Sequence, residues 1–429
     1  MAGLSKGVKG VGKEMVKKTV LLIATFDTKE REALFLKKRI EARGVFVLTM
    51  DTGILAPPQV RVNIDQREVA HRGGTPLEEM VVTGDKGKCL LNMMEGAKVI
   101  CKELYDQGLI HGVIGIGGAQ GTEIGCAAMR TLPIGVPRLM VSTIASGRAT
   151  FGPYVGTKDI TMMHSVADMQ GLNFLTKRIL ENAAGAICGM IEGLEESLTK
   201  PEGIPVALSM LGTTTPGALR CKKILEDRGF EVVTFHQNGT GGIAMEEMIR
   251  NRSFQGVMDL NLHEIGDRFV GGLHGAIRED RLEAAGAIGI PQVVAPGSIN
   301  YVVWGPLNSL SDKWRSRKLI VHNPNHTLVR LSPDELQGVG KVVAEKLNRA
   351  KGPTQVFIPL RGFSYPDREN LPHWEPEGNR AFINSLKKHL SPSIPVIELD
   401  AHINDPEFID PVTEAFLLMM GAGATTTIK

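Results

Sequence analysis

Aromatic residues and an excess of either charge are both scarce in this sequence. Only 5% of the 429 residues are aromatic, which argues against the stacking platforms that bind single-stranded nucleic acid. The 49 basic and 47 acidic residues nearly cancel, so charge does not favour nucleic acid or an anionic membrane as a partner. No apolar run has membrane-spanning length, and no signal peptide follows Met1. We therefore expect neither a nucleic-acid nor a membrane partner.

Paired cysteines and several standard catalytic motifs are also missing. The five cysteines are scattered singly, with no CxxC pair, which is typical of reduced thiols in a cytoplasmic protein. The absence of GxGxxG disfavours a dinucleotide oxidoreductase, which we keep as a weaker hypothesis. GxSxG and HExxH are absent too, so the sequence predicts neither a hydrolase nucleophile nor a zinc-protease helix.

Glycine, by contrast, is abundant, and the most informative stretch is a glycine-rich turn between a strand-like run and a helix-like run. Its residues are Gly117, Gly118, Ala119, Gln120, Gly121 and Thr122. Such a turn lets backbone N–H groups approach an anion, and the dipole of the helix expected at 123–130 adds attraction. Thr122 stands where its hydroxyl would cap that helix or contact a phosphate. We interpret the turn as a phosphate or nucleotide site; the alternative is a turn needed only for packing.

Two stretches of the chain repeat one βαβ pattern, which predicts parallel sheets. In the first, residues 19–50 read as strand, helix and strand, with Asp27-Thr28-Lys29 as the turn before the helix. Residues 204–236 repeat the succession, and Gly44 and Gly229 end the two helices at equivalent positions. The repetition predicts a duplicated α/β architecture.

The pattern predicts a domain organisation of two tandem Rossmann-like domains with mostly parallel sheets. We place a basic flexible leader at 1–18, the nucleotide-binding domain at 19–198 and the C-terminal domain at 204–429. A charged linker near 192–203, which ends in Pro and Gly, joins them. We expect an interdomain cleft between the two domains.

The strand ends of the first domain offer further ligand-binding groups, because open parallel sheets bind ligands beyond the carboxyl ends of their strands. These groups are Asp27, Thr28, Lys29, Asp51, Ser142 and Thr143. Asp51 stands where an acidic residue commonly binds ribose hydroxyls. Asp27 is a candidate magnesium ligand through water, and Lys29 a candidate to neutralise phosphates. Helix capping is the alternative role for Asp27 and Thr28.

The strand ends and polar loops of the second domain carry a separate set of charged residues. Asp259, His263 and Glu264 form a candidate acid/base cluster, or less favourably a metal site. Arg281 and Arg361 lie in strongly polar segments. We interpret all five as candidate substrate-binding residues, since such groups are costly to bury unless they are paired or bind a ligand. Mutual pairing is the structural alternative.

Five motifs recur together in one known family. They are TFDTKERE at 25–32, GIGGAQGT at 115–122, RLEAAGAIGIPQVVAPG at 281–297, PLRGFS at 359–364 and HINDPEF at 402–408. With them the chain resembles the ATP-binding domain family of the tomato mosaic virus resistance protein. The resemblance implies two Rossmann-like domains, ATP with Mg²⁺ at the strand ends and glycine turn of the first, and a homodimer. It also implies that plant members inhibit viral RNA replication by binding the viral replication protein.

These observations favour two hypotheses of different class. The first is a cytoplasmic ATP-binding enzyme that uses the nucleotide on a small polar or anionic metabolite bound between the domains. The second is a nucleotide-gated interaction protein without turnover, as the plant relatives suggest. Release of ADP, AMP or a phosphorylated product would distinguish them, because only an enzyme turns ATP over.

Overall fold

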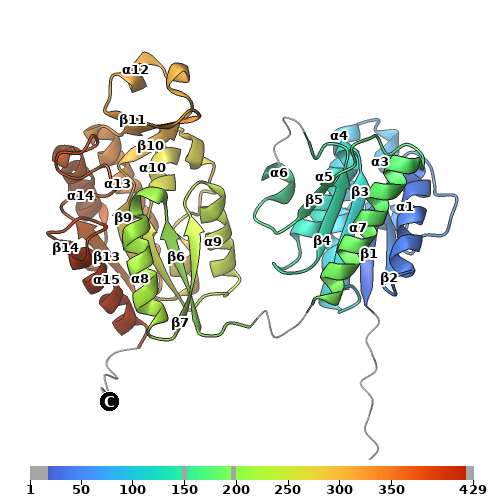
Figure 1. Ribbon diagram of the computed structural model, residues 1–429, viewed down its shortest axis with the longest axis horizontal. Coiled ribbons are helices and arrows are strands. Elements are labelled where there is room, and N and C mark those ends of the chain that lie inside the picture. The colour runs from blue at the N-terminus through green and yellow to red at the C-terminus, as the bar shows by residue number, and fades with distance from the viewer. Residues whose placement is uncertain (1–17, 147–151, 195–199, 422–429) are drawn as a thin grey trace, which may run out of the picture. The chain divides into compact units, whose positions relative to one another are not determined.

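The computed structural model describes residues 18–146, 152–194 and 200–421, and the chain divides into two compact units between Thr199 and Lys200 (Figure 1). Each unit contains its own mostly parallel sheet, as the repeated pattern predicts. The predicted leader lies outside the described residues except for Lys18, as does the middle of the predicted linker. No helix among the described ranges is long and apolar enough to span a membrane.

The first unit is built on a five-stranded parallel sheet of order β2-β1-β3-β4-β5. Its strands are β1 (Thr19–Ala24), β2 (Phe46–Asp51), β3 (Gly112–Gly117), β4 (Arg138–Ser142) and β5 (Thr161–His164). Its helices are α1 (Phe26–Glu41), α2 (Gln66–Arg72), α3 (Leu77–Val82), α4 (Lys86–Asp106), α5 (Ala119–Arg130), α6 (Gly152–Val155) and α7 (Phe174–Glu192). Helices α1 and α7 pack on one face, and α2, α4 and α5 on the other.

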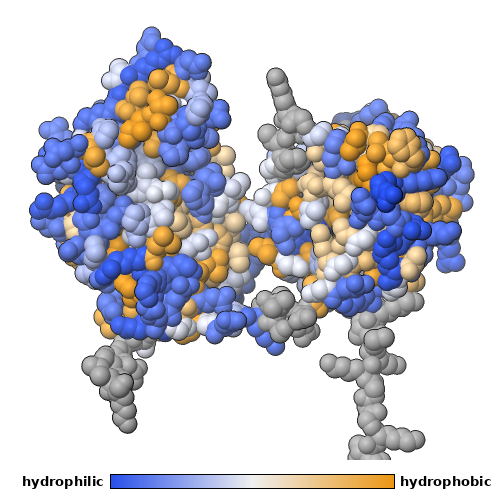
Figure 2. All heavy atoms as spheres, in the orientation of Figure 1, coloured by the Kyte–Doolittle hydropathy of each residue, from blue (hydrophilic) through white to orange (hydrophobic). Residues whose placement is uncertain are grey.

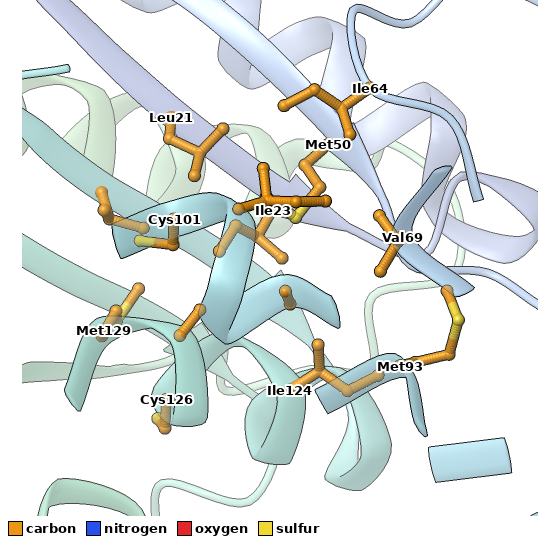
Figure 3. Packing of buried hydrophobic residues seen from close by; sticks show 14 of the residues in the cluster. Leu21, Ile23, Met50, Ile64, Val69, Met93, Cys101, Ile124, Cys126 and Met129 are labelled. Carbon is orange, nitrogen blue, oxygen red and sulfur yellow. The ribbon is translucent and has the colours of Figure 1, made fainter. Parts of the chain in front are cut away.

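Two hydrophobic cores separate these layers, and alternate residues of β1 supply both. Leu22 faces α1 and α7, whereas Leu21 and Ile23 face α4 and α5, as Figure 3 shows for the second core. This alternation follows from the two-residue period of a strand. Full burial of each such side chain stabilises the fold by about 1.5–3 kcal/mol.

Two helices of the first unit begin earlier than predicted. Helix α5 begins at Ala119, not near residue 123, because Gly118 already serves as its N-cap. Helix α1 begins at Phe26, so the expected turn at Asp27-Thr28-Lys29 is its first turn, with a kink at Lys29 (φ −128°, ψ 20°). The earlier start of α5 places Thr122 inside the helix, where it is buried and does not cap. Its hydroxyl instead lies 2.7 Å from that of Ser142.

The second unit repeats this strand order and extends it. Its parallel sheet has the order β14-β13-β9-β8-β6-β7. The strands are β6 (Ile204–Met210), β7 (Phe230–His236), β8 (Gly256–Asn261), β9 (Gln292–Gly297), β13 (Thr354–Pro359) and β14 (Val396–Leu399). The helices are α8 (Thr215–Glu226), α9 (Thr240–Arg250), α10 (His263–Val270), α11 (Ala284–Ile288), α12 (Asp312–Arg315), α13 (Pro333–Leu347), α14 (Pro376–His389) and α15 (Pro406–Met419). Helices α8 and α15 pack together against the sheet, and α13 packs with α14 in a separate core.

A small antiparallel sheet, which the sequence analysis does not predict, interrupts this pattern. It has the order β10-β12-β11, with β10 (Tyr301–Trp304), β11 (Leu319–Asn323) and β12 (His326–Arg330). Each strand is only four or five residues long, and the partly exposed β11 ends in the polar His322 and Asn323, which are typical of a loop. The insertion brings Tyr301 next to the start of α10, with its ring centroid 4.7 Å from that of His263.

Candidate functional site

A cavity of about 310 Å³ lies in the first unit where the loops after β1 and β3 meet. These strands are neighbours in the sheet, but their following helices, α1 and α5, lie on opposite faces (Figure 1). Such a topological switch point is where open α/β sheets bind their ligands. Seven of the predicted nucleotide-binding residues line the cavity: Asp27, Thr28, Lys29, Gly118, Ala119, Gln120 and Gly121.

The N-terminus of α5 forms one side of this cavity, and no side chain caps it. The first N–H groups of a helix have no partner within it, and together with the dipole they attract an anion. The two leading glycines have different roles here. A Cβ on Gly117 would come within 2.7 Å of the Gly121 Cα atom, so packing requires this glycine. A Cβ on Gly118 would meet nothing closer than Thr143 Oγ1 at 3.7 Å, so packing does not explain Gly118.

Lys29 brings a positive charge to the same cavity. Its side chain lines the cavity although the residue is only 7% exposed. Within the described part of the chain it has neither a hydrogen-bond acceptor nor a carboxylate partner. A lysine in a cavity wall without a carboxylate within ion-pair distance leaves its charge available to a ligand, so this arrangement favours an anion. The exposed Lys86, at the start of α4, adds a second cation to the cavity wall.

Asp27 adds a negatively charged carboxylate to the wall of the same cavity. Its Oδ2 atom accepts hydrogen bonds from the backbone N–H groups of Ile54 and Leu55, at 3.0 and 2.9 Å. Its Oδ1 atom is buried and has no partner among the described residues. Gly53 allows this approach, because a Cβ there would lie 2.6 Å from the Asp27 carboxyl carbon. One oriented oxygen therefore remains to bind a cation, a water molecule or a ligand hydroxyl.

Most of the rest of the cavity wall is apolar and was not predicted, although Thr25, Thr52 and the acidic Asp168 also line it. The apolar residues are Ile54, Leu55, Cys89, Leu90, Met93 and Ile124. Met93 and Ile124 also belong to the core between the sheet and helices α4 and α5, where Figure 3 shows them. An apolar wall beside polar groups suits a ligand with a flat apolar part and an anionic part. No sequence signal identified these residues, because apolar side chains on a helix read as core.

The remaining predicted residues of this site do not line the cavity. Asp51 is fully buried, and its Oδ1 atom accepts hydrogen bonds from the Phe26 and Gly53 N–H groups at 2.9 and 2.8 Å. Burial raises the pKa of this carboxyl to about 6. Ser142 is buried against Thr122. Asp51, Thr122 and Ser142 are therefore buried and do not line the cavity.

In the second unit, three of the predicted substrate residues pair with one another. Arg281 is 1% exposed and lies at the centre of a buried network. It donates to Asp259 at 2.9 Å, to Glu264 at 3.0 Å and to Glu246 at 3.2 Å. Burial raises the pKa of Glu264, an effect that the charge of Arg281 opposes. This is the mutual pairing that the sequence analysis kept as its alternative, and Glu246 is a member that it missed.

The other two predicted residues lie outside that network. Arg361 is exposed and donates to Asp400 at 2.8 and 2.7 Å. His263 is fully buried on α10, beside Asp267 and His274. Burial lowers the pKa of each histidine to about 4 and raises the pKa of Asp267 to about 7. The sequence analysis did not identify Asp267 or His274, because only the fold brings His274 back to α10.

Fold and cavity define a class of protein: two α/β units with parallel sheets, the first with a cavity at its switch point. Two family models match the chain. One is described as the N-terminal domain of the uncharacterised protein family UPF0261 and matches residues 18–196; the other is its C-terminal domain and matches residues 204–420. The chain belongs to the UPF0261 family.

Individual relatives agree with this assignment. A UPF0261 protein of Clostridium tetani is 41% identical and covers 94% of this chain and 99% of its own length. The ToMV resistance protein Tm-1(GCR237) of Solanum lycopersicum is 34% identical over 77% of this chain and 44% of its own length. This second relative confirms the resemblance to the tomato mosaic virus resistance protein that the motifs predicted, while ATP binding stays a prediction.

One solved structure matches this chain over most of its length, but only weakly. The glycosyltransferase SsfS6 of Streptomyces sp. SF2575, complexed with thymidine diphosphate, is 13% identical. The match covers 94% of this chain and 96% of the glycosyltransferase, with a TM-score of 0.17. A TM-score this low supports no inference about this chain.

Proposed function

We propose that the first unit binds ATP or a related nucleotide together with Mg²⁺, and that the protein is an enzyme acting on a small polar or anionic metabolite. One observation carries the nucleotide proposal: Lys29 and the uncapped N-terminus of α5 meet at one cavity. Both attract an anion, and no described carboxylate neutralises the lysine. A phosphate group satisfies the lysine and the helix N-terminus together.

The cavity also fits the other parts of such a ligand. Its apolar wall, which includes Leu90 and Met93, suits the face of a nucleobase. The unpartnered Oδ1 of Asp27 suits Mg²⁺ held through water, because magnesium keeps most of its waters and uses one or two carboxylates. The metal would supply charge to neutralise the phosphates. Asp51 holds the ends of β1 and β2 in place through the Phe26 and Gly53 N–H groups.

A nucleotide-gated interaction protein is the second candidate. A 34% identical relative is named as a ToMV resistance protein, which suggests a role in binding rather than turnover. Exposed apolar side chains also gather around α3 and the start of α4 (Figure 2), among them Val81, Val82 and Leu91. Such patches are typical of contact surfaces, and this one is a candidate for the expected homodimer.

Calorimetry on a glycine variant tests the nucleotide proposal. Gly118→Val adds bulk at the N-terminus of α5, where the backbone is extended and a Cβ has room. We expect the variant to fold and its affinity for ATP with Mg²⁺ to fall at least about tenfold, because the side chain blocks backbone approach to the phosphates. Gly189→Val on α7, where a Cβ meets nothing within 4 Å, is the matched control and should bind like the parent. Unchanged affinity in Gly118→Val would place the site elsewhere.

A turnover assay then separates the two candidates. The parent and Gly118→Val are incubated with ATP, Mg²⁺ and pools of polar metabolites, and the nucleotides are resolved by chromatography. An enzyme releases ADP, AMP or a phosphorylated product with at least one pool, and Gly118→Val loses that activity. Tight ATP binding without turnover in any pool, together with a nucleotide-dependent change of oligomeric state, would instead support the interaction protein.

A further inference from the structure

Three side chains of the second unit direct their ligand atoms to one point. His263 and Asp267 lie one turn apart on α10, and His274 comes from the 3₁₀ turn η3 (Leu273–Gly275) that follows. The Nε2 atom of His263 is 3.1 Å from Nδ1 of His274 and 3.2 Å from Oδ1 of Asp267. All three ligand atoms lie within 4.8 Å of one another.

A backbone carbonyl group fixes the orientation of the His263 ring. Its Nδ1 atom lies 3.1 Å from the Ser298 carbonyl oxygen, which only accepts hydrogen bonds, so Nδ1 carries the proton. In the neutral ring the lone pair is therefore on Nε2, the atom that faces Asp267 and His274. Metal-binding histidines show this arrangement, in which a backbone carbonyl sets the tautomer and orients the other nitrogen.

Asp267 is a buried carboxylate without a lysine or arginine partner. It is fully buried, and its oxygens accept hydrogen bonds from the backbone N–H groups of Val303 and His274, at 2.8 and 2.7 Å. Across the described ranges, no lysine or arginine forms an ion pair with it; the titratable groups beside it are His263 and His274. Buried charges in proteins are paired or bind metals, so this position favours a cation.

With Asp267 ionised, the three groups conflict with one another unless a proton or a cation lies between them. If His274 donates to the lone pair of His263 Nε2, the Asp267 carboxylate still faces that lone pair at 3.2 Å. A divalent cation removes the conflict by accepting all three lone pairs. With metal–ligand distances of about 2.0–2.1 Å, tetrahedral ligand atoms lie about 3.3 Å apart, close to the 3.1 and 3.2 Å found here.

We propose that His263, Asp267 and His274 bind one divalent transition-metal ion, with Zn²⁺ preferred. Two imidazoles and one carboxylate suit zinc and related ions better than Mg²⁺ or Ca²⁺, which prefer oxygen ligands. Three protein ligands leave a position open to water or a substrate oxygen, as in catalytic zinc sites. His274 is only half buried, and His326 lies next to it with ring centroids 6.5 Å apart, so the open position faces the half-buried side.

This site is independent of the nucleotide proposal and lies in a different unit. It gives the second unit a group that can bind a substrate oxygen, which the mutually paired Arg281 network does not offer. The metal-site proposal is therefore tested by metal binding alone, whatever ligand the first unit binds.

Metal titration of the full-length, tag-free protein tests the site. After chelator treatment, the parent should bind one Zn²⁺ per chain by calorimetry and by elemental analysis after dialysis. His274→Ala and Asp267→Asn should each weaken binding by about a hundredfold or more, since each removes a ligand. His236→Ala, which removes an exposed imidazole from the same end of the sheet, is the matched control and should bind like the parent.

Spectroscopy on the parent protein tests the proposed metal site even if a variant fails to fold. Replacement with Co²⁺ should give the visible bands of a tetrahedral ion, and X-ray absorption of the Zn²⁺ form should show two imidazoles and oxygen ligands. Absence of stoichiometric binding would overturn the proposal. So would binding that survives both ligand substitutions in folded protein, or an absorption spectrum with oxygen ligands only.

Discussion

At the scale of single residues, Lys29 is the group whose role is most easily tested. Replacing it with Met keeps most of the buried chain and removes the charge. We expect Lys29→Met to lower the affinity for ATP with Mg²⁺ by about ten- to a hundredfold, because a hydrogen bond to a charged group contributes about 1.5–3 kcal/mol. The unfolding temperature without ligand should stay about the same, since the ammonium has no hydrogen bond or ion pair within the described residues to lose.

The matched control is Lys88→Met. Lys88 lies on α4 with its side chain 76% exposed, and it contacts only Asp85 at 3.6 Å. This substitution should change neither affinity nor stability. If the two lysine variants bind ATP equally well by calorimetry, Lys29 is a structural residue and the phosphates bind elsewhere.

The raised pKa of Asp51 predicts that the stability of the protein depends on pH. Burial raises the pKa of its carboxyl to about 6, above the usual value of 3.8. The folded protein thus holds this proton more tightly than the unfolded chain, and Asp51 makes folding less favourable as pH rises from about 4 to about 6. Asp51→Asn keeps an oxygen that accepts from Phe26 and Gly53 but removes the titration. The variant should gain stability relative to the parent between pH 4 and 7.5, on the order of 2 kcal/mol.

Urea unfolding of parent and variant at both pH values measures this difference. A constant difference in the free energy of unfolding between pH 4 and pH 7.5 would contradict the raised pKa. A loss of stability at pH 7.5 would show instead that the charged form is the one that the fold favours.

At the scale of elements, two adjacent glycines in the packing of α5 on the end of β3 are predicted to differ in how much they contribute to stability. Gly117→Ala places a Cβ 2.7 Å from the Cα atom of Gly121, and backbone must move to relieve it. We expect a loss of about 1–3 kcal/mol in urea unfolding. Gly118→Ala places a Cβ in open space on extended backbone and should change stability by less than about 0.5 kcal/mol. Equal losses would show that the turn needs both glycines for packing.

At the scale of the whole molecule, the two units have separate sheets and separate cores, which predicts that ligands act on them separately. Scanning calorimetry should resolve two unfolding transitions. ATP with Mg²⁺ at a hundred times its dissociation constant should stabilise one unit by about 2.7 kcal/mol, and Zn²⁺ should raise the other transition. A single cooperative transition that both ligands shift would show that the units unfold together.

Local patterns in the sequence predicted much of the fold. The strand–turn–helix repeats, with buried apolar runs and helix-ending glycines, predicted two α/β units with mostly parallel sheets, because these patterns act over a few neighbouring residues. The sequence also located the loops that line the cavity, since ligands bind at strand ends in such sheets. The four- to five-residue strands β10, β11 and β12 escaped prediction because each is short, although β11 and β12 form a local hairpin in which Asn323 pairs with His326.

Which polar residues are paired and which line the cavity depends on the tertiary structure alone. Asp51 and Asp27 look alike in sequence, and in each one oxygen accepts two backbone N–H groups while the other has no partner among the described residues, but only Asp27 lines the cavity. Arg281 reads as a substrate residue until the fold brings three carboxylates to it. His274 gains a candidate role only because η3 folds back on α10. The physical reason is that burial and pairing depend on residues far apart in the chain, which local patterns do not encode.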